Sequence, residues 1–260
     1  VGSGVVYLVT TEHTEETPIF KGALARAINA TTGQQIWTLS DYTGEFLTSS
    51  YAMADGYNTW FNGYDNQVYS VGRGPSATTV QAPLTAVSAG NSVVIQGTVM
   101  DVSAGAQQSE QKADFPNGVP VCSDASMTAW MGYVYQQQPE PTNFTGVTVT
   151  LTAIDPNGNY ITLGQATTDA TGHFIYSWQT PPVPGKYTIT ATSAGTNGYW
   201  GSSDETGMIV QNAQATLAPT ATPLTGLASN TTVEYGIVAI AIIIIVIGAV
   251  LALLVTRKRP

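Results

Sequence analysis

The apolar and polar positions of this chain follow two patterns, and the more pronounced one lies at the carboxy-terminal end. Residues 235–255 form an apolar run without a charged side chain. A bilayer core of ~30 Å requires ~20 helical residues at ~1.5 Å each, so the run predicts a transmembrane helix over 234–256. A buried core helix is the alternative, although such helices rarely lack a polar face over this length.

Basic residues after the run predict its orientation. Arg257, Lys258 and Arg259 follow it directly, and such clusters stay on the cytoplasmic side under the positive-inside rule. We therefore interpret them as a membrane stop within a cytoplasmic tail, 257–260. This single-pass topology places everything before the helix outside the cell.

The other pattern, short apolar runs between turns, begins in the first 75 residues. Runs of about five residues are separated by Gly, Asn and Asp, which predicts an antiparallel meander. The expected strands are 5–9, 23–28, 35–39, 49–53, 57–61 and 67–71.

One stretch of this meander carries a repeat motif. Residues 27–37 read AINATTGQQIW and resemble A-x-D-x-x-T-G-x-x-x-W, the blade signature of pyrroloquinoline-quinone-like (PQQ-like) β-propellers. Residues 54–69 resemble the second half of that repeat. In the resemblance a short polar residue, Thr and Gly close a turn and Trp packs on the next blade. The matching positions are Ala27, Asn29 (where Asp is usual), Thr32, Gly33 and Trp37.

The resemblance implies that 1–75 are the final blades of a PQQ-like propeller. Propellers have 4–8 four-stranded blades, so the remaining blades are expected upstream of Val1. The chain has no initiator Met and no signal peptide, and we expect it to be the carboxy-terminal piece of a longer protein. The last repeat ends after its third strand at Val71, so its outer strand is expected from the missing amino end.

A second β domain is predicted over 76–211, after the boundary Gly72–Pro75. The alternation indicates a sandwich with strands 79–87, 92–101, 147–154, 160–163, 174–178, 187–191 and 208–210. The order G-V-x-V-x-L…D-P-x-G…T-D-x-x-G-x-F…P-G-x-Y-x-I-x-A over 146–191 resembles the immunoglobulin-like (Ig-like) modules of prokaryotic surface proteins. The fold class is therefore all-β: a partial propeller, an Ig-like sandwich with a helical insertion, and one transmembrane helix.

The insertion, 104–139, interrupts the strand pattern. Residues 104–121 are polar and predict a loop, and Ser123 or Asp124 caps a helix that ends at Gln138. Four apolar residues fall on one face of that helix. The face packs on the sandwich edge or the propeller, or it is a partner-docking face, since Met and Trp favour adaptable contacts. These residues are Met127, Trp130, Met131 and Val134.

Residues 212–233 are rich in Ala, Thr and Pro and carry no charge, and they predict a stalk. Candidate glycosylation sites are Asn29, Asn143 and Asn230, each of which heads an N-x-Thr sequence.

Composition excludes several function classes. The net charge is −9, and about −12 remains once the three basic tail residues are set aside, so we expect no nucleic-acid partner. A single cysteine, Cys122, excludes internal disulfides and multi-cysteine metal sites. It precedes the predicted helix start, a position that can lower a thiol's pKa, but no motif places a His beside it.

Candidate catalytic chemistry is sparse. His13 lies among Glu12, Glu15 and Glu16, which form either a weak cation site or a solvated loop, and His173 lies in a turn. No catalytic, cofactor-binding or metal-ligating residue is predicted.

These features predict a membrane-anchored cell-surface protein that resembles archaeal and other prokaryotic surface proteins. Its expected role is binding or structural: adhesion, surface-layer association or scaffolding of a complex, with the bilayer, other surface proteins or glycans as partners. The alternative is a membrane-tethered quinone-dependent oxidoreductase whose active site lies in the missing amino-terminal part. PQQ is expected only under that alternative.

Overall fold

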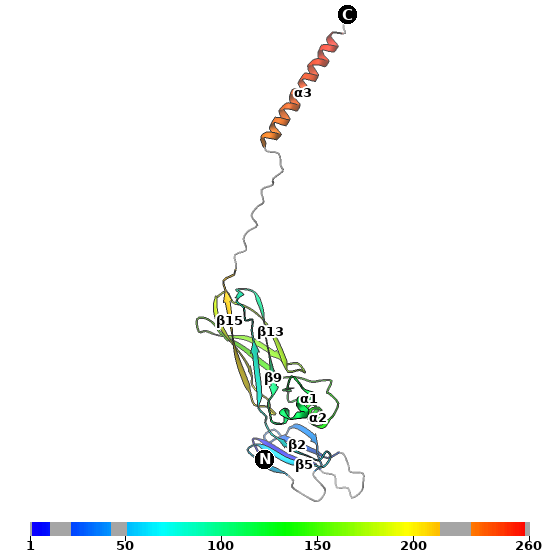
Figure 1. The fold of residues 1–260 in the computed structure, drawn as a ribbon, viewed down its shortest axis with the longest axis vertical. Helices are drawn as coiled ribbons and strands as arrows, with labels where there is room; N and C mark the ends of the chain where they lie inside the picture. The colour runs from blue at the N-terminus through cyan, green and yellow to red at the C-terminus, as the bar shows by residue number, and fades with distance from the viewer. Residues whose placement is uncertain (1, 11–21, 43–50, 214–229, 258–260) are drawn as a thin grey trace. The chain divides into compact units, whose positions relative to one another are not determined.

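The computed structural model describes residues 2–10, 22–42, 51–213 and 230–257. The chain divides into two compact units, Val1–Gln214 and Ala215–Pro260. The first is mostly β and contains both the meander and the sandwich, so the boundary predicted at 75/76 falls inside one compact unit (Figure 1). The described residues of the second, 230–257, contain one helix.

The meander forms two antiparallel three-stranded sheets, in the orders β1-β2-β3 and β4-β5-β6. Most strands begin and end within one residue of the prediction, because Gly, Asn and Asp residues form the described turns between them. The exception is the fourth, predicted over 49–53: the strand begins at Ala52, and 49 and 50 lie outside the described residues. The strands are β1 Val5–Thr10, β2 Leu24–Asn29, β3 Gln35–Ser40, β4 Ala52–Ala54, β5 Tyr57–Asn62 and β6 Gln67–Val71.

Each of these small sheets buries one face. Ala25 and Ala27 on β2 are buried while their neighbours are half-exposed, and Asn58, Trp60 and Asn62 are buried on β5. This two-residue period is the expected pattern of a half-buried strand.

The sandwich consists of a four-stranded and a five-stranded sheet. In the first, β9 pairs along one edge with β7. Along its other edge β9 pairs with β13 over residues 92–98 and with β10 over residues 100–101. The second has the order β12-β11-β14-β15-β8. The strands are β7 Ser76–Gln81, β8 Val87–Ser88, β9 Ser92–Asp101, β10 Val119–Pro120, β11 Thr148–Ile154, β12 Tyr160–Thr167, β13 His173–Gln179, β14 Gly185–Ser193 and β15 Ser202–Gln211.

The strand predicted over 79–87 is wrong. The chain leaves β7 after Gln81 and joins the opposite sheet as β8, which pairs in parallel with β15. Pro83 lies in the gap, and because proline has no N–H it interrupts a ladder.

A shared apolar core joins the two sheets. Trp178 of β13 meets Tyr187 of β14 edge to face, with ring centroids 5.6 Å apart. Val80 N–H, at the edge of the first sheet, donates to Asp204 of β15 at 2.9 Å. Other fully buried side chains are Ile95, Val99, Val149, Leu151, Phe174, Ile189, Met208 and Val210.

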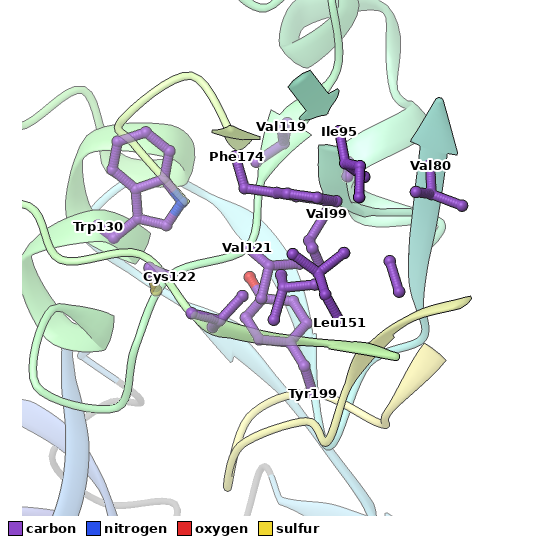
Figure 2. Close-up of a cluster of buried hydrophobic side chains, with 14 of the residues drawn as sticks. Val80, Ile95, Val99, Val119, Val121, Cys122, Trp130, Leu151, Phe174 and Tyr199 are labelled. Atoms are coloured by element: carbon purple, nitrogen blue, oxygen red, sulfur yellow. The ribbon is translucent and has the colours of Figure 1, made fainter. Parts of the chain in front are cut away.

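The insertion is more ordered than its polar composition indicates. The predicted loop 104–121 contains a 3₁₀ turn η1 (Gly105–Gln107), helix α1 (Ser109–Asp114) and β10. Helix α2 covers Met127–Gln136 and is shorter at both ends than predicted. Its carboxyl end is set by Gln137, which adopts a left-handed conformation (φ 53°). Figure 2 shows Val119, Val121, Cys122 and Trp130 of the insertion beside sandwich residues such as Phe174 and Leu151.

The predicted boundary at 72–75 is a docked connection. Gly74 N–H donates to Gly198 O at 2.8 Å, and Trp200 N–H donates to Gly74 O at 2.8 Å. The Arg73 guanidinium lies 4.2 Å from the centre of the Trp200 ring and donates to Tyr199 O at 2.9 Å. The connection between meander and sandwich is therefore held on both its backbone and its side chains.

The second unit contains α3, Asn230–Thr256. The helix begins four residues before the predicted 234, so 230–233, assigned to the stalk, are helical. It is long and apolar enough to cross a membrane, and no part of its span is buried. At ~1.5 Å per residue its length exceeds a ~30 Å bilayer core. The backbone of Arg257 continues its bonding, with N–H donating to Leu253 O at 3.0 Å. Stalk residues 214–229, Lys258 and Arg259 lie outside the described residues.

Candidate functional site

The blade-motif residues form a closed turn between β2 and β3. The Asn29 side-chain oxygen accepts hydrogen bonds from Thr31 N and Thr32 N at 2.9 and 3.0 Å. Gly33 takes a positive φ of 71°, which glycine adopts without a steric penalty. Asn29 stands where the propeller signature usually has Asp, and its side-chain oxygen supplies the same hydrogen-bond acceptor. These contacts give the motif a structural role.

The remaining motif residues are internal. Ala27 and Trp37 are buried, and the Trp37 ring lies 6.0 Å from that of Tyr7 on β1.

Polar and aromatic side chains form a cluster on the buried face of the second small sheet, β4-β5-β6. Trp60 stacks between Tyr51 and Tyr69, with centroid distances of 5.3 and 5.8 Å. Each tyrosine donates to a carboxylate, Tyr51 to Asp41 at 2.9 Å and Tyr69 to Asp65 at 2.6 Å. Burial raises the pKa of Tyr51 and of Tyr69, so both phenols stay protonated and donate.

Asp41 is the electrostatically unusual member of this cluster. It is fully buried, and burial raises the pKa of its carboxyl to about 6 despite the hydrogen bond from Tyr51. Its second oxygen and Trp60 Nε1 have no hydrogen-bond partner within the part of the chain that the structure describes. No sequence motif marks Asp41, since its burial comes from contacts between separate strands.

Helix α2 closes the open edge of β3. Thr38 N–H donates to the Thr128 hydroxyl at 3.0 Å, and Gln136 accepts from Ser40 N–H at 3.2 Å. Gln136 also donates to Ser40 O at 2.8 Å. Unpaired edge strands invite pairing with other chains, so the insertion protects this edge.

The predicted apolar face of α2 points into the chain. Trp130 donates from Nε1 to Pro120 O at 3.1 Å and packs on Phe144 with centroids 4.6 Å apart. Met127, Trp130 and Val134 are each at most 5% exposed, and Met131 is half-buried. The prediction of a partner-docking face is therefore wrong: these side chains complete the core of their own unit, which is the other alternative.

An open groove of about 470 Å³ lies beside this contact. Leu24 and Ser40 belong to its β-sheet side, and Gln136 of α2 lines the facing side. The loop after α2 completes it with Pro139, Glu140, Pro141, Thr142 and Asn143. Sequence reasoning missed this groove because its walls come from segments about 100 residues apart.

Cys122 is a core residue. Burial raises the pKa of its thiol to about 12, with the nearby Asp124 and Asp101 carboxylates acting in the same direction. The lowering that a helix start can cause does not occur here, because α2 begins five residues later and desolvation dominates, so Cys122 keeps the bystander role that the sequence favours.

Of the other titratable candidates, His173 lies within the described residues, and it belongs to no metal-binding cluster there. His173 is exposed at the start of β13, directly after the turn organised by Asp169, and Asp169 accepts from His173 N–H at 3.0 Å. His13 and its three glutamates lie outside the described residues. Within the described ranges no three His, Cys, Asp or Glu side chains gather as a metal site would require.

The candidate glycosylation sites differ in structure. Asn29 is engaged in its turn, Asn143 is exposed in the loop after α2, and the Asn230 side chain lies outside the described residues.

Comparisons with known proteins identify no family. No family model and no curated protein matches the chain. The chain is similar to a solved structure of the tetra-tandem repeat in the extending region of a large adhesion protein, with 14% identity and a TM-score of 0.31. That match covers 73% of this chain and 38% of the other.

A second similar structure is Spo0M, a sporulation control protein from Bacillus subtilis. It has 11% identity and a TM-score of 0.28, with 52% of this chain and 49% of the other covered. The chain thus spans less than half of either protein, and at TM-scores this low neither likeness assigns a fold or a role.

Proposed function

We propose that this chain is a membrane-anchored cell-surface protein with a binding or structural role. Helix α3 holds it in the bilayer as a single-pass anchor with the carboxy terminus in the cytoplasm. The first compact unit, Val1–Gln214 (the β unit), is displayed outside, where it serves adhesion, surface-layer association or assembly of a complex. The observation that carries this proposal is the exposed, uninterrupted apolar surface of α3.

Leaving α3 in water costs free energy, which favours its insertion into a membrane. Every described side chain from Thr231 to Arg257 is exposed, and most of those from Ile237 to Val255 are aliphatic. Exposed apolar surface costs about 25 cal/mol per Å², and an apolar patch of this size marks an interaction or membrane surface. A lipid core removes that surface from water and leaves the helical backbone hydrogen bonds satisfied.

Strand topology supports an Ig-like module. The sandwich has seven long strands, β7, β9, β11, β12, β13, β14 and β15, counted here as the first to the seventh. The first, second and fifth form one sheet, and the fourth, third, sixth and seventh form the other. An immunoglobulin constant domain differs only in that its fourth strand lies beside the fifth. Tyr187, near the start of the sixth strand, donates from its hydroxyl to Val183 O at 2.8 Å, as the tyrosine corner of that fold does.

The strand order of the two small sheets supports blade-like repeats. Both are antiparallel meanders with one buried face, and the turn after β2 is closed by the motif residues Asn29 and Gly33. We propose that they are the final blades of a PQQ-like propeller.

Membrane retention in cells tests the anchor. We expect the full chain to sediment with membranes and to resist an alkaline wash. Ile243→Lys with Ile244→Lys should release it, because a central Lys costs about 2.5–3.5 kcal/mol. Leu84→Lys, at a residue 98% exposed on the β unit, is the matched control and should stay bound. Retention of the double variant would contradict the proposal.

Protease treatment of intact cells tests the orientation. The β unit should be digested and a carboxy-terminal tag protected, and the reverse pattern would contradict an external display. Cells that release the protein should also lose the binding or surface assembly that it supports, measured by cell sedimentation.

The tethered oxidoreductase stays a separate hypothesis, which requires that the purified protein retain quinone and reduce a dye acceptor.

A further inference from the structure

The loop that follows α2 presents Asn143 outward from a fixed backbone. Phe144 packs inward on Trp130. Thr145 N–H donates to the Ser126 hydroxyl at 2.9 Å, and Thr145 O accepts from Ser123 N–H at 2.9 Å. The residues on the carboxyl side of Asn143 are therefore anchored at the start of α2.

The acceptor sequence itself is accessible. Asn143, Thr142 and Thr145 are exposed. The part of the chain that the structure describes offers no hydrogen bond to the Asn143 amide or the Thr145 hydroxyl, the two groups that define an N-x-Thr acceptor. Asn29 differs, because its side-chain oxygen already closes the turn to β3.

Asn143 also lines the groove between α2 and β3. The groove is open and about 470 Å³, and it combines aliphatic with polar side chains. Leu24, Pro139 and Pro141 provide apolar contacts, whereas Thr142 and Glu140 provide hydrogen-bonding groups. A sugar ring has the same mixture, with C–H faces and a rim of hydroxyls.

We propose that Asn143 carries an N-linked oligosaccharide whose first sugars occupy this groove. The donor is a lipid phosphate-linked oligosaccharide and the catalyst is the cell's own transferase. Asn143 Nδ2 bonds to the anomeric carbon as the bond from that carbon to the phosphate oxygen breaks. The amide loses one proton, and the lipid phosphate leaves. The attached glycan extends the cover over the β3 edge that Gln136 and Thr128 begin.

This inference rests on the proposed function, since the β unit must meet the transferase outside the cytoplasm. The test uses the full chain purified from membranes of the cells that make it, with peptide masses measured after proteolysis. We expect an oligosaccharide mass on the peptide that contains Asn143. The variant Thr145→Val keeps the shape of the side chain and both backbone hydrogen bonds, and it should abolish that mass.

A control variant separates failure of the Asn143 site from failure of the external display. Asn159→Thr creates an N-x-Thr acceptor headed by Asn157, in the exposed turn 155–159. Modification of Asn157 without modification of Asn143 would overturn the Asn143 site and leave the external display intact. If neither asparagine is modified, the Asn143 site is overturned, and protease digestion of intact cells decides the external display separately.

The placement of the sugars has its own readout. With the glycan attached, amide hydrogen exchange in 136–143 should be slower than in the Thr145→Val variant, whereas exchange in the distant turn 155–159 should not change. Equal exchange in 136–143 would overturn occupation of the groove, even with the modification present.

Discussion

The side-chain amide of Gln136 pairs with the backbone of Ser40 in both directions. Ser40 N–H donates to Gln136 Oε1 at 3.2 Å, and Gln136 Nε2 donates to Ser40 O at 2.8 Å. A neighbouring strand would offer the same donor and acceptor, so one glutamine replaces one residue of a strand. Ser40 O also accepts from Asn62 Nδ2 at 3.0 Å. Both small sheets and the inserted helix therefore meet at this carbonyl.

Gln136→Ala should destabilise the β unit by about 1–3 kcal/mol, because it leaves the Ser40 N–H without its partner in a largely covered site. Denaturant unfolding of the full chain in detergent, followed by tryptophan fluorescence, measures the loss. Gln108→Ala removes the same side chain from an exposed position before α1, where it makes no capping hydrogen bond with the described residues. Equal losses for the two variants would contradict a role for the amide pair.

Asp41 should make stability depend on pH in an unusual direction. Its folded-state pKa of about 6 exceeds the ordinary value of 3.8, so the folded chain holds a proton that the unfolded chain releases between about pH 4 and 6. Stability should therefore fall as pH rises through that window, by at most about 3 kcal/mol.

Asp41→Asn should remove this slope, because an amide does not titrate there. Asp114→Asn, on the exposed surface of α1, is the control and should leave the slope in place. The free energy of unfolding measured from pH 4 to 7 decides. A slope that persists in Asp41→Asn would assign it to another group.

Cys122 should be inert in the folded protein. Because its thiol pKa is raised to about 12, almost no thiolate exists at pH 8, and the side chain is fully buried. An alkylating reagent should modify it only as fast as the chain unfolds, measured by mass. Ser177→Cys adds an exposed thiol on β13 as an internal reference that should react at once. Comparable rates for the two thiols would contradict the burial.

Arg73→Ala should loosen the connection between meander and sandwich. The change removes the cation–π contact with Trp200 and the hydrogen bond to Tyr199 O, together worth about 1–3 kcal/mol. Amide exchange at Gly74 and Trp200 should accelerate, because their backbone bonds hold this connection. Arg26→Ala, in an exposed side-chain pair with Gln35, is the control and should not affect those amides.

Local pattern was sufficient for most of the strands and for the carboxy-terminal helix. The two-residue alternation of β9 and the apolar run of α3 appear directly in the sequence, because the periods of strand and helix differ and turn residues bound them. The helix at α2 was likewise predictable, although its ends shifted by a few residues. Pro83 carried a signal for the break between β7 and β8 that a continuous 79–87 strand ignored.

Tertiary structure alone decided which surfaces are covered and which groups meet. The sequence marks Met127, Trp130 and Val134 as one apolar face but not what lies against it, and the fold turns that face inward. Asp41, Trp60 and Tyr51 carry no joint motif, yet they form one buried cluster. The Gln136–Ser40 pair joins residues 96 positions apart. Local propensity depends on neighbours along the chain, whereas burial, desolvation and edge pairing depend on which distant segments pack together.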